Sequence, residues 1–275
     1  MSGDWPLASD WLAGGSDDPS ALVVAGVPLV EHAITPSRYD LAPAAVRQRL
    51  RRLSTWHGQR RVALEHVEVR DVGDSLTPPP LDAPLTILLG GHNEVTHAAL
   101  AAAGPLDGWG LLTLDAHHDV RPYQAGAVGN GSPVRALIDA GLPGGNVVQV
   151  GIHGFSNSRA HYEWCLAAGI TVLGPGRLPD VADLLDILAG RCDAIYVDVD
   201  LDVLDRAFAP GCPGSRPGGA RPEDVFEAAF AAGAHPSVRA VDIVEVDPEA
   251  DVAHVTVDAA ALTLLNVAAG YATRR

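Results

Sequence analysis

The sequence predicts an α/β fold in which helices cover both faces of a mostly parallel sheet. Short apolar runs rich in β-branched residues recur along the chain, and each is followed by an alanine-rich stretch with helical period. Most of these runs are continuously apolar rather than alternating, which is typical of strands buried on both faces. A chain of 275 residues, of which 47% are hydrophobic, is long enough to bury such a sheet.

The elements follow from these patterns in chain order. The predicted strands are short apolar runs at 22–27, 85–89, 110–115, 147–152, 170–173, 194–199 and 239–245, with a weaker eighth near 62–69. Apolar residues at helical spacing predict helices at 39–53, 94–103, 132–140, 157–168, 180–189, 222–232 and 256–270. The Pro- and Gly-rich connections are neither long nor polar enough to separate two domains, so we expect residues 1–275 to form a single catalytic domain.

The charge balance excludes several classes of function. The chain holds 19 basic residues, all of them arginine, against 34 acidic ones, which gives a net charge of −15. Without lysine, neither a Schiff base with pyridoxal phosphate nor a P-loop is available. An acidic chain repels nucleic-acid phosphates and anionic lipids. We therefore expect a small-molecule substrate, with no nucleic-acid and no membrane partner.

The cysteines and the first residues of the sequence point to the cytoplasm. Cys165, Cys192 and Cys212 form no CxxC pair, so neither a disulfide framework nor a thiolate zinc site is expected. The acidic N-terminal segment does not resemble a secretory signal, and no apolar stretch is long enough to span a bilayer. We expect a cytoplasmic protein.

Ligand-type polar residues follow directly on the ends of four predicted strands. His92 follows the strand at 85–89, and Glu245 ends the strand at 239–245. Two further strands lead into aspartate-rich clusters, which are Asp115, His117 and Asp119 in the first and Asp198, Asp200, Asp202 and Asp205 in the second. In open α/β sheets ligands bind at the carboxyl ends of the strands, so we expect these clusters to share one rim. Because buried like charges need a cation between them, the rim predicts a metal site.

The donor set indicates which metal and which chemistry to expect. Carboxylates and imidazoles without a thiolate suit Mn²⁺, Fe²⁺, Co²⁺, Ni²⁺ or Zn²⁺ better than Ca²⁺ or Mg²⁺, and abundant carboxylates favour two ions that share bridging ligands. Two such ions acidify a water molecule enough to produce hydroxide at neutral pH. The predicted reaction class is metal-assisted hydrolysis.

Four motifs resemble those of the dinuclear-manganese ureohydrolases, the family of arginase, agmatinase, guanidinobutyrase and formimidoylglutamase. The motifs are GGHNE, DAHHD, VDLDVLDRAFAPG and VEVDP, in that order over about residues 85–250. The resemblance implies an arginase-like three-layer α/β fold with a central, mostly parallel sheet of about eight strands. It also implies a homo-oligomer that holds two Mn²⁺ ions per chain.

The resemblance further implies the metal ligands and the catalytic residues. The implied ligands are His92, Asp115, His117, Asp119, Asp200 and Asp202. Asp115 and Asp200 bridge the two ions in this assignment, while it stays open whether Asp198, Asp205 and His118 are functional or structural. Glu245 matches the carboxylate that grips the nitrogen end of the substrate. The expected catalytic residues are therefore Asp115, Asp200 and Glu245.

Departures from the arginase pattern indicate the substrate. Arginases and agmatinases carry a histidine where GNGSPVR places Asn130, and formimidoylglutamases commonly lack it. Arg121, two residues beyond Asp119, would present a fixed cation to a dicarboxylate substrate. Glu245, Asn130, Arg121 and His153 are the expected substrate-binding residues. The predicted reaction is hydrolysis of N-formimidoyl-L-glutamate to glutamate and formamide by a metal-bridging hydroxide, a step in histidine degradation.

Two other functions stay open at this point. One is a guanidino-group hydrolase that releases urea from arginine, hydroxyarginine, a guanidino acid or agmatine. The other is a homologue that binds metal or ligand without turnover. The intact set of carboxylates favours an enzyme over the second alternative.

Overall fold

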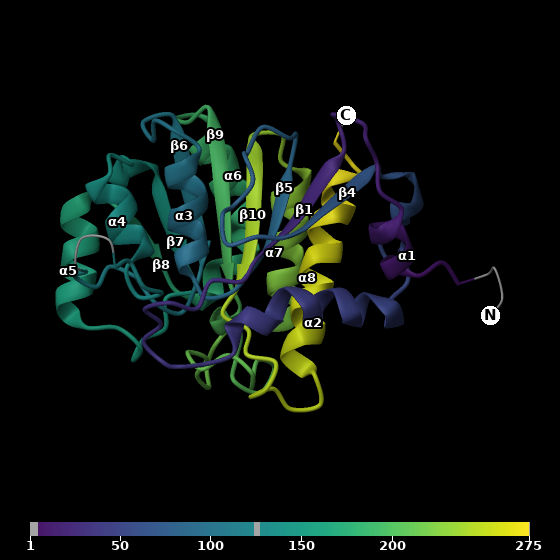
Figure 1. The fold of residues 1–275 in the computed structure, drawn as a ribbon. Coiled ribbons are helices and arrows are strands. Elements are labelled where there is room, and N and C mark those ends of the chain that lie inside the picture. Colours follow the sequence, from purple (N-terminus) through teal and green to yellow (C-terminus); the bar gives the residue numbers. More distant parts are fainter. Residues whose placement is uncertain (1–4, 124–126, 275) are drawn as a thin grey trace.

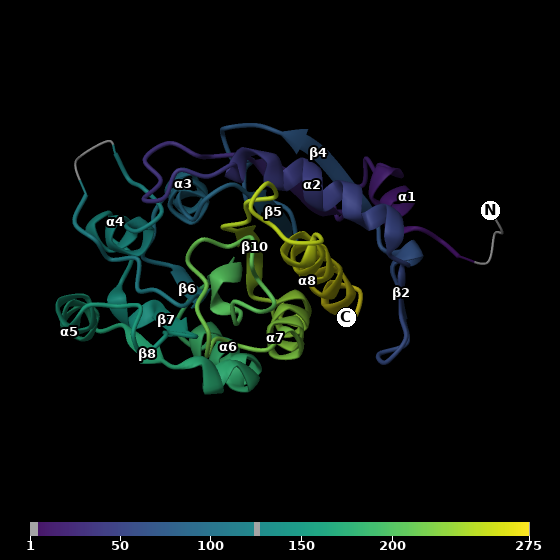
Figure 2. The same ribbon diagram turned by 90° about the horizontal axis from the view of Figure 1, so that it is seen from below.

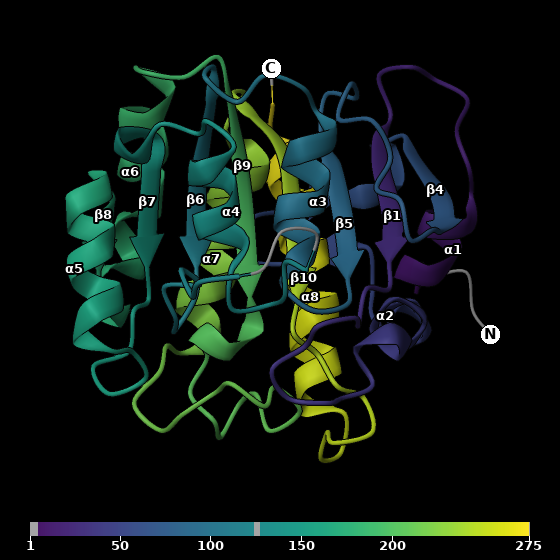
Figure 3. The same ribbon diagram turned by 60° about the vertical axis from the view of Figure 1, so that its left-hand side comes forward.

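Eight parallel strands form one central sheet in the computed structural model, which describes residues 5–123 and 127–274 (Figure 1). Across the sheet the strands are ordered β4-β1-β5-β10-β9-β6-β7-β8, and their arrows run in one direction (Figure 3). Their bounds are β1 Leu22–Val27, β4 Val69–Asp74, β5 Thr86–Gly90, β6 Trp109–Leu114, β7 Val147–Val150, β8 Thr171–Leu173, β9 Ala194–Asp200 and β10 Val238–Val244. This architecture confirms the predicted fold class.

Helices cover both faces of the sheet and complete three layers (Figure 2). One face carries α2 Ala42–Arg49, α6 Val181–Ala189, α7 Pro222–Ala234 and α8 Val255–Tyr271, with α1 Ala8–Ala13 beside α2. The other face carries α3 Glu94–Ala102, α4 Pro133–Asp139 and α5 Arg159–Ala168. Neighbouring residues of a strand point to opposite faces, so Ile87 belongs to the apolar cluster under α8 and Leu88 to the cluster under α3. This is why the strands read as continuously apolar.

Two elements differ from the prediction. The prediction of a weak strand of the main sheet near 62–69 is wrong. Val62–Ala63 (β3) pairs antiparallel with Trp56–His57 (β2), and the eighth strand of the main sheet is β4. Because β4 is an edge strand with mostly exposed residues, it has no continuous apolar run to reveal it. Helix α1 was not predicted, since its six residues are too few to show a helical period.

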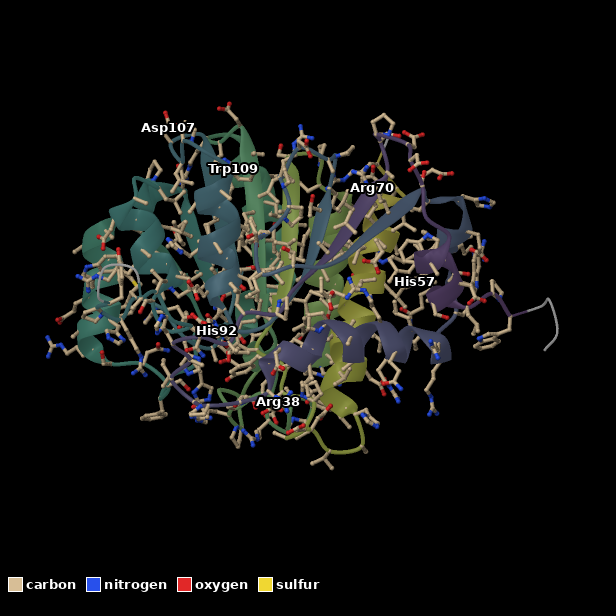
Figure 4. The ribbon with its side chains drawn as sticks, in the orientation of Figure 1. Arg38, His57, Arg70, His92, Asp107 and Trp109 are labelled. Carbon is tan, nitrogen blue, oxygen red and sulfur yellow. The ribbon has the colours of Figure 1, made fainter. Side chains whose placement is uncertain are left out.

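The candidate site lies at the carboxyl ends of four strands of the sheet. The four strands β5, β10, β9 and β6 are neighbours in the sheet, and their carboxyl ends meet at one rim. In Figure 4, His92 lies at this rim, whereas Trp109, the first residue of β6, lies at the opposite end. Within the described part of the chain, no helix is both long and apolar enough to cross a membrane.

Candidate metal centre

The ends of β6 and β9 bring five of the predicted metal ligands together. Asp115, His117 and Asp202 form one group, and Asp115, Asp119 and Asp200 form a second. Within each group the possible ligand atoms all lie within 4.8 Å of one another. The four aspartates are buried. Asp115 belongs to both groups, as a ligand that bridges two ions must.

Backbone N–H groups fix one oxygen of three of these carboxylates. The His117 N–H donates to Asp115 Oδ1 at 2.6 Å, and the Asp202 N–H donates to Asp200 Oδ1 at 2.8 Å. The Ala116 N–H donates to Asp202 Oδ1 at 3.1 Å. The second oxygen of Asp202 lies 2.8 Å from His117 Nδ1. The loops after the strands therefore aim the free carboxylate oxygens at the other ligand side chains.

Two residues of the rim adopt a backbone conformation that side-chain-bearing residues rarely adopt. Asp119 has φ 52° and Glu245 has φ 67°, both in the left-handed region. Such strain persists only where the surrounding structure enforces it, and it clusters at functional sites. Here it turns both carboxylates inward at the ends of β6 and β10.

The structure corrects the prediction for His92. This residue is fully buried, but it is not part of either ligand group. Its Nε2 lies 2.7 Å from the carbonyl oxygen of Glu31, and its Nδ1 accepts the Glu94 N–H at 3.1 Å. Both ring nitrogens are thus used by the backbone. The turn between β5 and α3 points His92 away from the carboxylates and toward the segment before α2.

Asn93, which the sequence reasoning missed, takes the place expected for His92. Its side-chain nitrogen lies 2.9 Å from Asp119 Oδ2 and 3.5 Å from both Asp115 Oδ2 and Asp200 Oδ2. Asn93 is adjacent to His92 in GGHNE, so the motif indicated the correct turn, but the prediction chose the residue one position too early. Nothing in the motif itself shows which of two neighbours in a tight turn faces the rim.

The electrostatics of the carboxylates favour bound cations. Burial, reinforced by the nearby Asp202, raises the pKa of Asp115 to about 7, and burial with neighbouring carboxylates raises the pKa of Asp119 and Asp200 well above the ordinary value. Burial alone would lower the pKa of His117, but Asp202 and Asp115 raise it to about 12. The centre holds more negative charge than its own side chains neutralise. Carboxylate and imidazole donors of this kind fit divalent transition ions.

The negative charge of the metal centre predicts how the stability of the metal-free protein depends on pH. The pKa of Asp115 is about 7 in the folded chain against an ordinary 3.8, so the folded metal-free protein binds more protons and loses stability as pH rises from about 4 to 7. Because divalent cations relieve that cost, we expect Mn²⁺ to raise the melting temperature more at pH 8 than at pH 6. Differential scanning fluorimetry with and without Mn²⁺ measures the difference. An equal or larger Mn²⁺ effect at pH 6 would contradict the assignment.

Glu245 faces the same rim from β10 and is held by two hydrogen bonds. Its Oε1 accepts the Asn130 side-chain amide and the Asn93 N–H, each at 2.9 Å. Burial raises the pKa of Glu245 to about 7, against the lowering effect of these bonds. Asn130 Oδ1 in turn accepts the Ile34 N–H at 2.9 Å. Two of the predicted substrate residues are therefore linked to each other and to the segment before α2.

A cavity of about 130 Å³ opens over the ligand groups. Glu245, Asn130 and Arg121 line it, as predicted, beside ligands from both groups. Tyr39, at the start of a short 3-10 helix before α2, and Arg216, in the loop that follows AFAPG, also line it and were not predicted, since neither belongs to a motif. A Cβ atom at Gly214 would collide with Asp202 Oδ2, so only glycine lets this loop approach the centre.

The structure places His153 outside the set of described residues that line the cavity, so its substrate role stays a prediction. Its Nε2 lies 3.0 Å from the carbonyl oxygen of Pro217, and its Nδ1 lies 3.2 Å from Ser156 Oγ. Asp205 accepts the N–H groups of Ala207 and Gly218, so it also holds a loop. Both side chains thus contact the loops that follow β7 and β9 rather than the ligand groups.

Two other residues left open are buried, His118 in the loop after β6 and Asp198 in β9. His118 Nδ1 lies 2.7 Å from Gln149 Oε1. Asp198 faces Asp242 across the neighbouring strand β10, and burial with this second carboxyl group raises the pKa of Asp198 well above the ordinary value. Neither side chain joins the ligand groups among the described residues.

The chain is similar in sequence and fold to known proteins. The formimidoylglutamase of Bacillus subtilis (strain 168) is 31% identical over 274 residues, covering 89% of this chain and 85% of that protein. The crystal structure of formimidoylglutamase from B. subtilis matches with a TM-score of 0.89 at 30% identity, covering 100% of this chain and 94% of that one. A Trypanosoma cruzi formiminoglutamase with Mn²⁺ shares the fold, with a TM-score of 0.86 at 22% identity over 99% of this chain and 100% of that one.

A more distant relative acts on a different group. The proclavaminate amidinohydrolase of Streptomyces clavuligerus is 32% identical over 173 residues, covering 59% of this chain and 54% of that protein. A family model described as the arginase family matches residues 80–270, the stretch that runs from β5 to α8 and carries the whole carboxylate rim. With its parallel eight-stranded sheet and its aspartate clusters at the ends of β6 and β9, this chain belongs to the arginase family.

Proposed function

We propose that this protein hydrolyses N-formimidoyl-L-glutamate to glutamate and formamide. One observation carries the proposal: a single cavity is lined by ligands of the metal centre, by the buried Glu245 and by two arginines, Arg121 and Arg216. A buried carboxylate suits a cationic formimino group, and two arginines suit a substrate with two carboxylates. The 31% sequence identity to the formimidoylglutamase of B. subtilis supports the proposal of this reaction.

We infer that two Mn²⁺ ions are the cofactors. Asp115, His117 and Asp202 would hold one ion, and Asp115, Asp119 and Asp200 would hold the other, with Asp115 common to both. The family resemblance adds Asp200 as a second residue shared by the two ions. The support is the donor set, in which oxygen dominates and sulfur is absent among the ligand atoms. When bound, the ions supply a water molecule acidic enough to act as a nucleophile near neutral pH.

The chain's own residues would bind and orient the substrate. The Glu245 carboxylate accepts an N–H of the formimino group, and Asn130 keeps that carboxylate in place. Arg121 and Arg216 pair with the two carboxylates of the glutamate moiety. Arg216 Nη1 donates to the carbonyl oxygens of its own loop, which fixes this guanidinium on the cavity wall. In the overall reaction, water adds its oxygen to the formimino carbon, the bond to the glutamate nitrogen breaks, and that nitrogen takes a proton.

A substrate panel tests this function directly. The purified protein loaded with Mn²⁺ is incubated with formimidoylglutamate, arginine, hydroxyarginine, agmatine and guanidinobutyrate, and formamide and urea are measured. We expect formamide from formimidoylglutamate at a kcat/KM that exceeds the value for every guanidino compound. Faster release of urea would establish the alternative, a guanidino-group hydrolase, which the proclavaminate amidinohydrolase of S. clavuligerus represents among the relatives.

Arg121→Ala tests the recognition of the dicarboxylate. Losing a hydrogen-bonded charge partner costs about 1.5–3 kcal/mol, or roughly 10- to 150-fold in kcat/KM. We expect the lower kcat/KM to arise from a raised KM with little change in kcat, because Arg121 would bind a carboxylate of the substrate and not the reacting formimino group. Arg121→Lys should restore only part of it, since lysine lacks the bidentate fork.

Arg159→Ala is the matched control for this variant. Arg159 is an exposed arginine of α5 whose guanidinium pairs with Glu163 outside the cavity. It should keep wild-type kinetics. An Arg121→Ala protein with an unchanged KM for formimidoylglutamate would remove the argument for a dicarboxylate substrate.

We also propose that the chain works as a single catalytic domain, as a homo-oligomer and in the cytoplasm, on a step of histidine degradation. The three buried cysteines are unpaired, which suits a reducing compartment. The homo-oligomer rests on the family resemblance. Light scattering coupled to gel filtration measures the number of chains per particle.

A further inference from the structure

The loop that carries His117 is held in place by the segment that follows β7. Residues 115–120 lie beyond β6 in neither a helix nor a strand, so their buried N–H and C=O groups need partners elsewhere. The Asp115 N–H donates to the carbonyl oxygen of the last residue of β7, and the His153 N–H donates to the Ala116 carbonyl oxygen, each at 3.0 Å. The peptide groups nearest His117 obtain further partners from side chains.

Asn157 binds the backbone on both sides of His117. Its Oδ1 accepts the His118 N–H at 3.0 Å, and its Nδ2 donates to the Ala116 carbonyl oxygen at 2.8 Å. An N–H group needs the amide oxygen and a carbonyl group needs the amide nitrogen, so only one orientation of the Asn157 side chain makes both bonds. Ala116 and His118 are buried, so little water competes for them.

Gln149 of β7 holds the far side of the same loop. Its Nε2 donates to the His118 carbonyl oxygen at 2.8 Å, and its Oε1 lies 2.7 Å from His118 Nδ1. The His117 N–H donates to Asp115 Oδ1 at 2.6 Å. The backbone around His117 is therefore fixed from both sides, while the imidazole stays directed at the centre, with Nδ1 2.8 Å from Asp202 Oδ2.

The two aspartates at the ends of this loop have backbone anchors of their own. Asp115 is tied to β7 through its N–H, and the Asp119 carbonyl oxygen accepts the Arg135 N–H of α4 at 3.3 Å. His117 lies midway between these anchors. Of the three ligand residues in the loop, it is thus the one whose position depends most on Asn157.

We propose that Asn157 is the positioning residue for His117: it fixes the peptide groups on both sides of this histidine and so presents the imidazole to the ion shared with Asp115 and Asp202. This inference rests on the metal centre of the proposed function. Partners that orient the ligands of a metal ion contribute about 10- to 100-fold to its affinity. Loss of Asn157 should therefore weaken the His117 site and spare the site of Asp115, Asp119 and Asp200.

Mn²⁺ titration of the metal-free protein, without substrate, tests the proposal. Calorimetry measures the two affinities, and electron paramagnetic resonance reports whether the two ions are coupled. Asn157→Leu removes both hydrogen bonds while keeping a similar volume, and we expect it to weaken one of the two sites about 10- to 100-fold. Asn157→Ala serves the same purpose if the leucine variant does not fold.

Asn146→Leu is the matched control. Asn146 is a half-buried asparagine whose Nδ2 donates to the Trp109 carbonyl oxygen at 3.2 Å, at the opposite end of β6. This variant should leave both affinities unchanged. Wild-type affinity for both ions in the Asn157 variant that folds overturns the proposal.

The His117→Asn background shows whether Asn157 acts through His117. His117→Asn already lacks the ion of its own site, so adding Asn157→Leu should leave the affinity for the remaining ion within about twofold of His117→Asn alone. A merely structural role would weaken the remaining site as well. Such a further loss in the double variant, or weakening of both sites in Asn157→Leu, also overturns the proposal.

These results are separable from a failure of the proposed function. A wild type that binds two Mn²⁺ ions, loses one site in Asn157→Leu and releases no formamide keeps the positioning role and removes the proposed substrate. A wild type that binds two ions and releases formamide, with unchanged affinities in Asn157→Leu, keeps the function and removes the positioning role. A wild type that binds no Mn²⁺ removes the metal centre and this inference together.

Discussion

Asp115→Asn is expected to abolish binding of both metal ions and to lower kcat/KM by more than about 100-fold, since loss of even an outer residue of a metal site costs about 10- to 100-fold. Asp115 is the one residue that both ligand groups share. A neutral amide at this position leaves two cations with one negative charge fewer and one bridging oxygen fewer. Metal content by mass spectrometry and formamide release measure the two effects.

His117→Asn provides the contrast to Asp115→Asn. His117 belongs to one group only, so this variant should lose one ion and retain the other. Asp183→Asn, an exposed aspartate of α6, is the control that changes the net charge by the same amount. Two bound ions with full activity in Asp115→Asn would refute a shared bridging ligand.

Glu245→Gln is expected to lower kcat/KM for formimidoylglutamate by roughly 30- to 5000-fold, the equivalent of about 2–5 kcal/mol for one partner of a buried charge pair. Glutamine keeps the size of the side chain and one acceptor oxygen for Asn130 and the Asn93 N–H. It removes the charge that attracts the formimino cation. Steady-state kinetics give the loss.

Metal content separates this effect from damage to the centre. Glu245 is in neither ligand group, so Glu245→Gln should still bind two Mn²⁺ ions. Activity within threefold of the wild type would show that Glu245 does not bind the reacting group. Loss of metal in this variant would assign Glu245 to the metal centre instead.

The residues of the rim could be predicted from the sequence because the end of a buried strand is visible in a short stretch of residues. A buried strand reads as an apolar run, and the side chains just beyond its end are fixed in position by the sheet. Asp115, Asp119, Asp200 and Asp202 therefore come together as predicted from runs that are far apart in the chain.

The remaining differences arise where position depends on a turn or a distant loop. His92 and Asn93 are neighbours in one tight turn, and only the approach of the segment around Glu31 decides that the histidine faces away. Tyr39 and Arg216 reach the cavity from segments outside the four motifs, and their positions depend on the path of the folded chain. No periodic pattern encodes such a path.

The position of β10 has a consequence for how the protein is made. β10 is the last strand in the sequence, yet it lies in the middle of the sheet between β5 and β9. While the ribosome synthesises the chain, β4, β1 and β5 emerge as one half of the sheet and β9, β6, β7 and β8 as the other, with no strand to join them. Asn93 stands on the first half and the aspartates on the second. Only a nascent chain extended past Val244 joins the two halves, and Glu245 follows that residue, so the cavity over the ligand groups is completed late in synthesis.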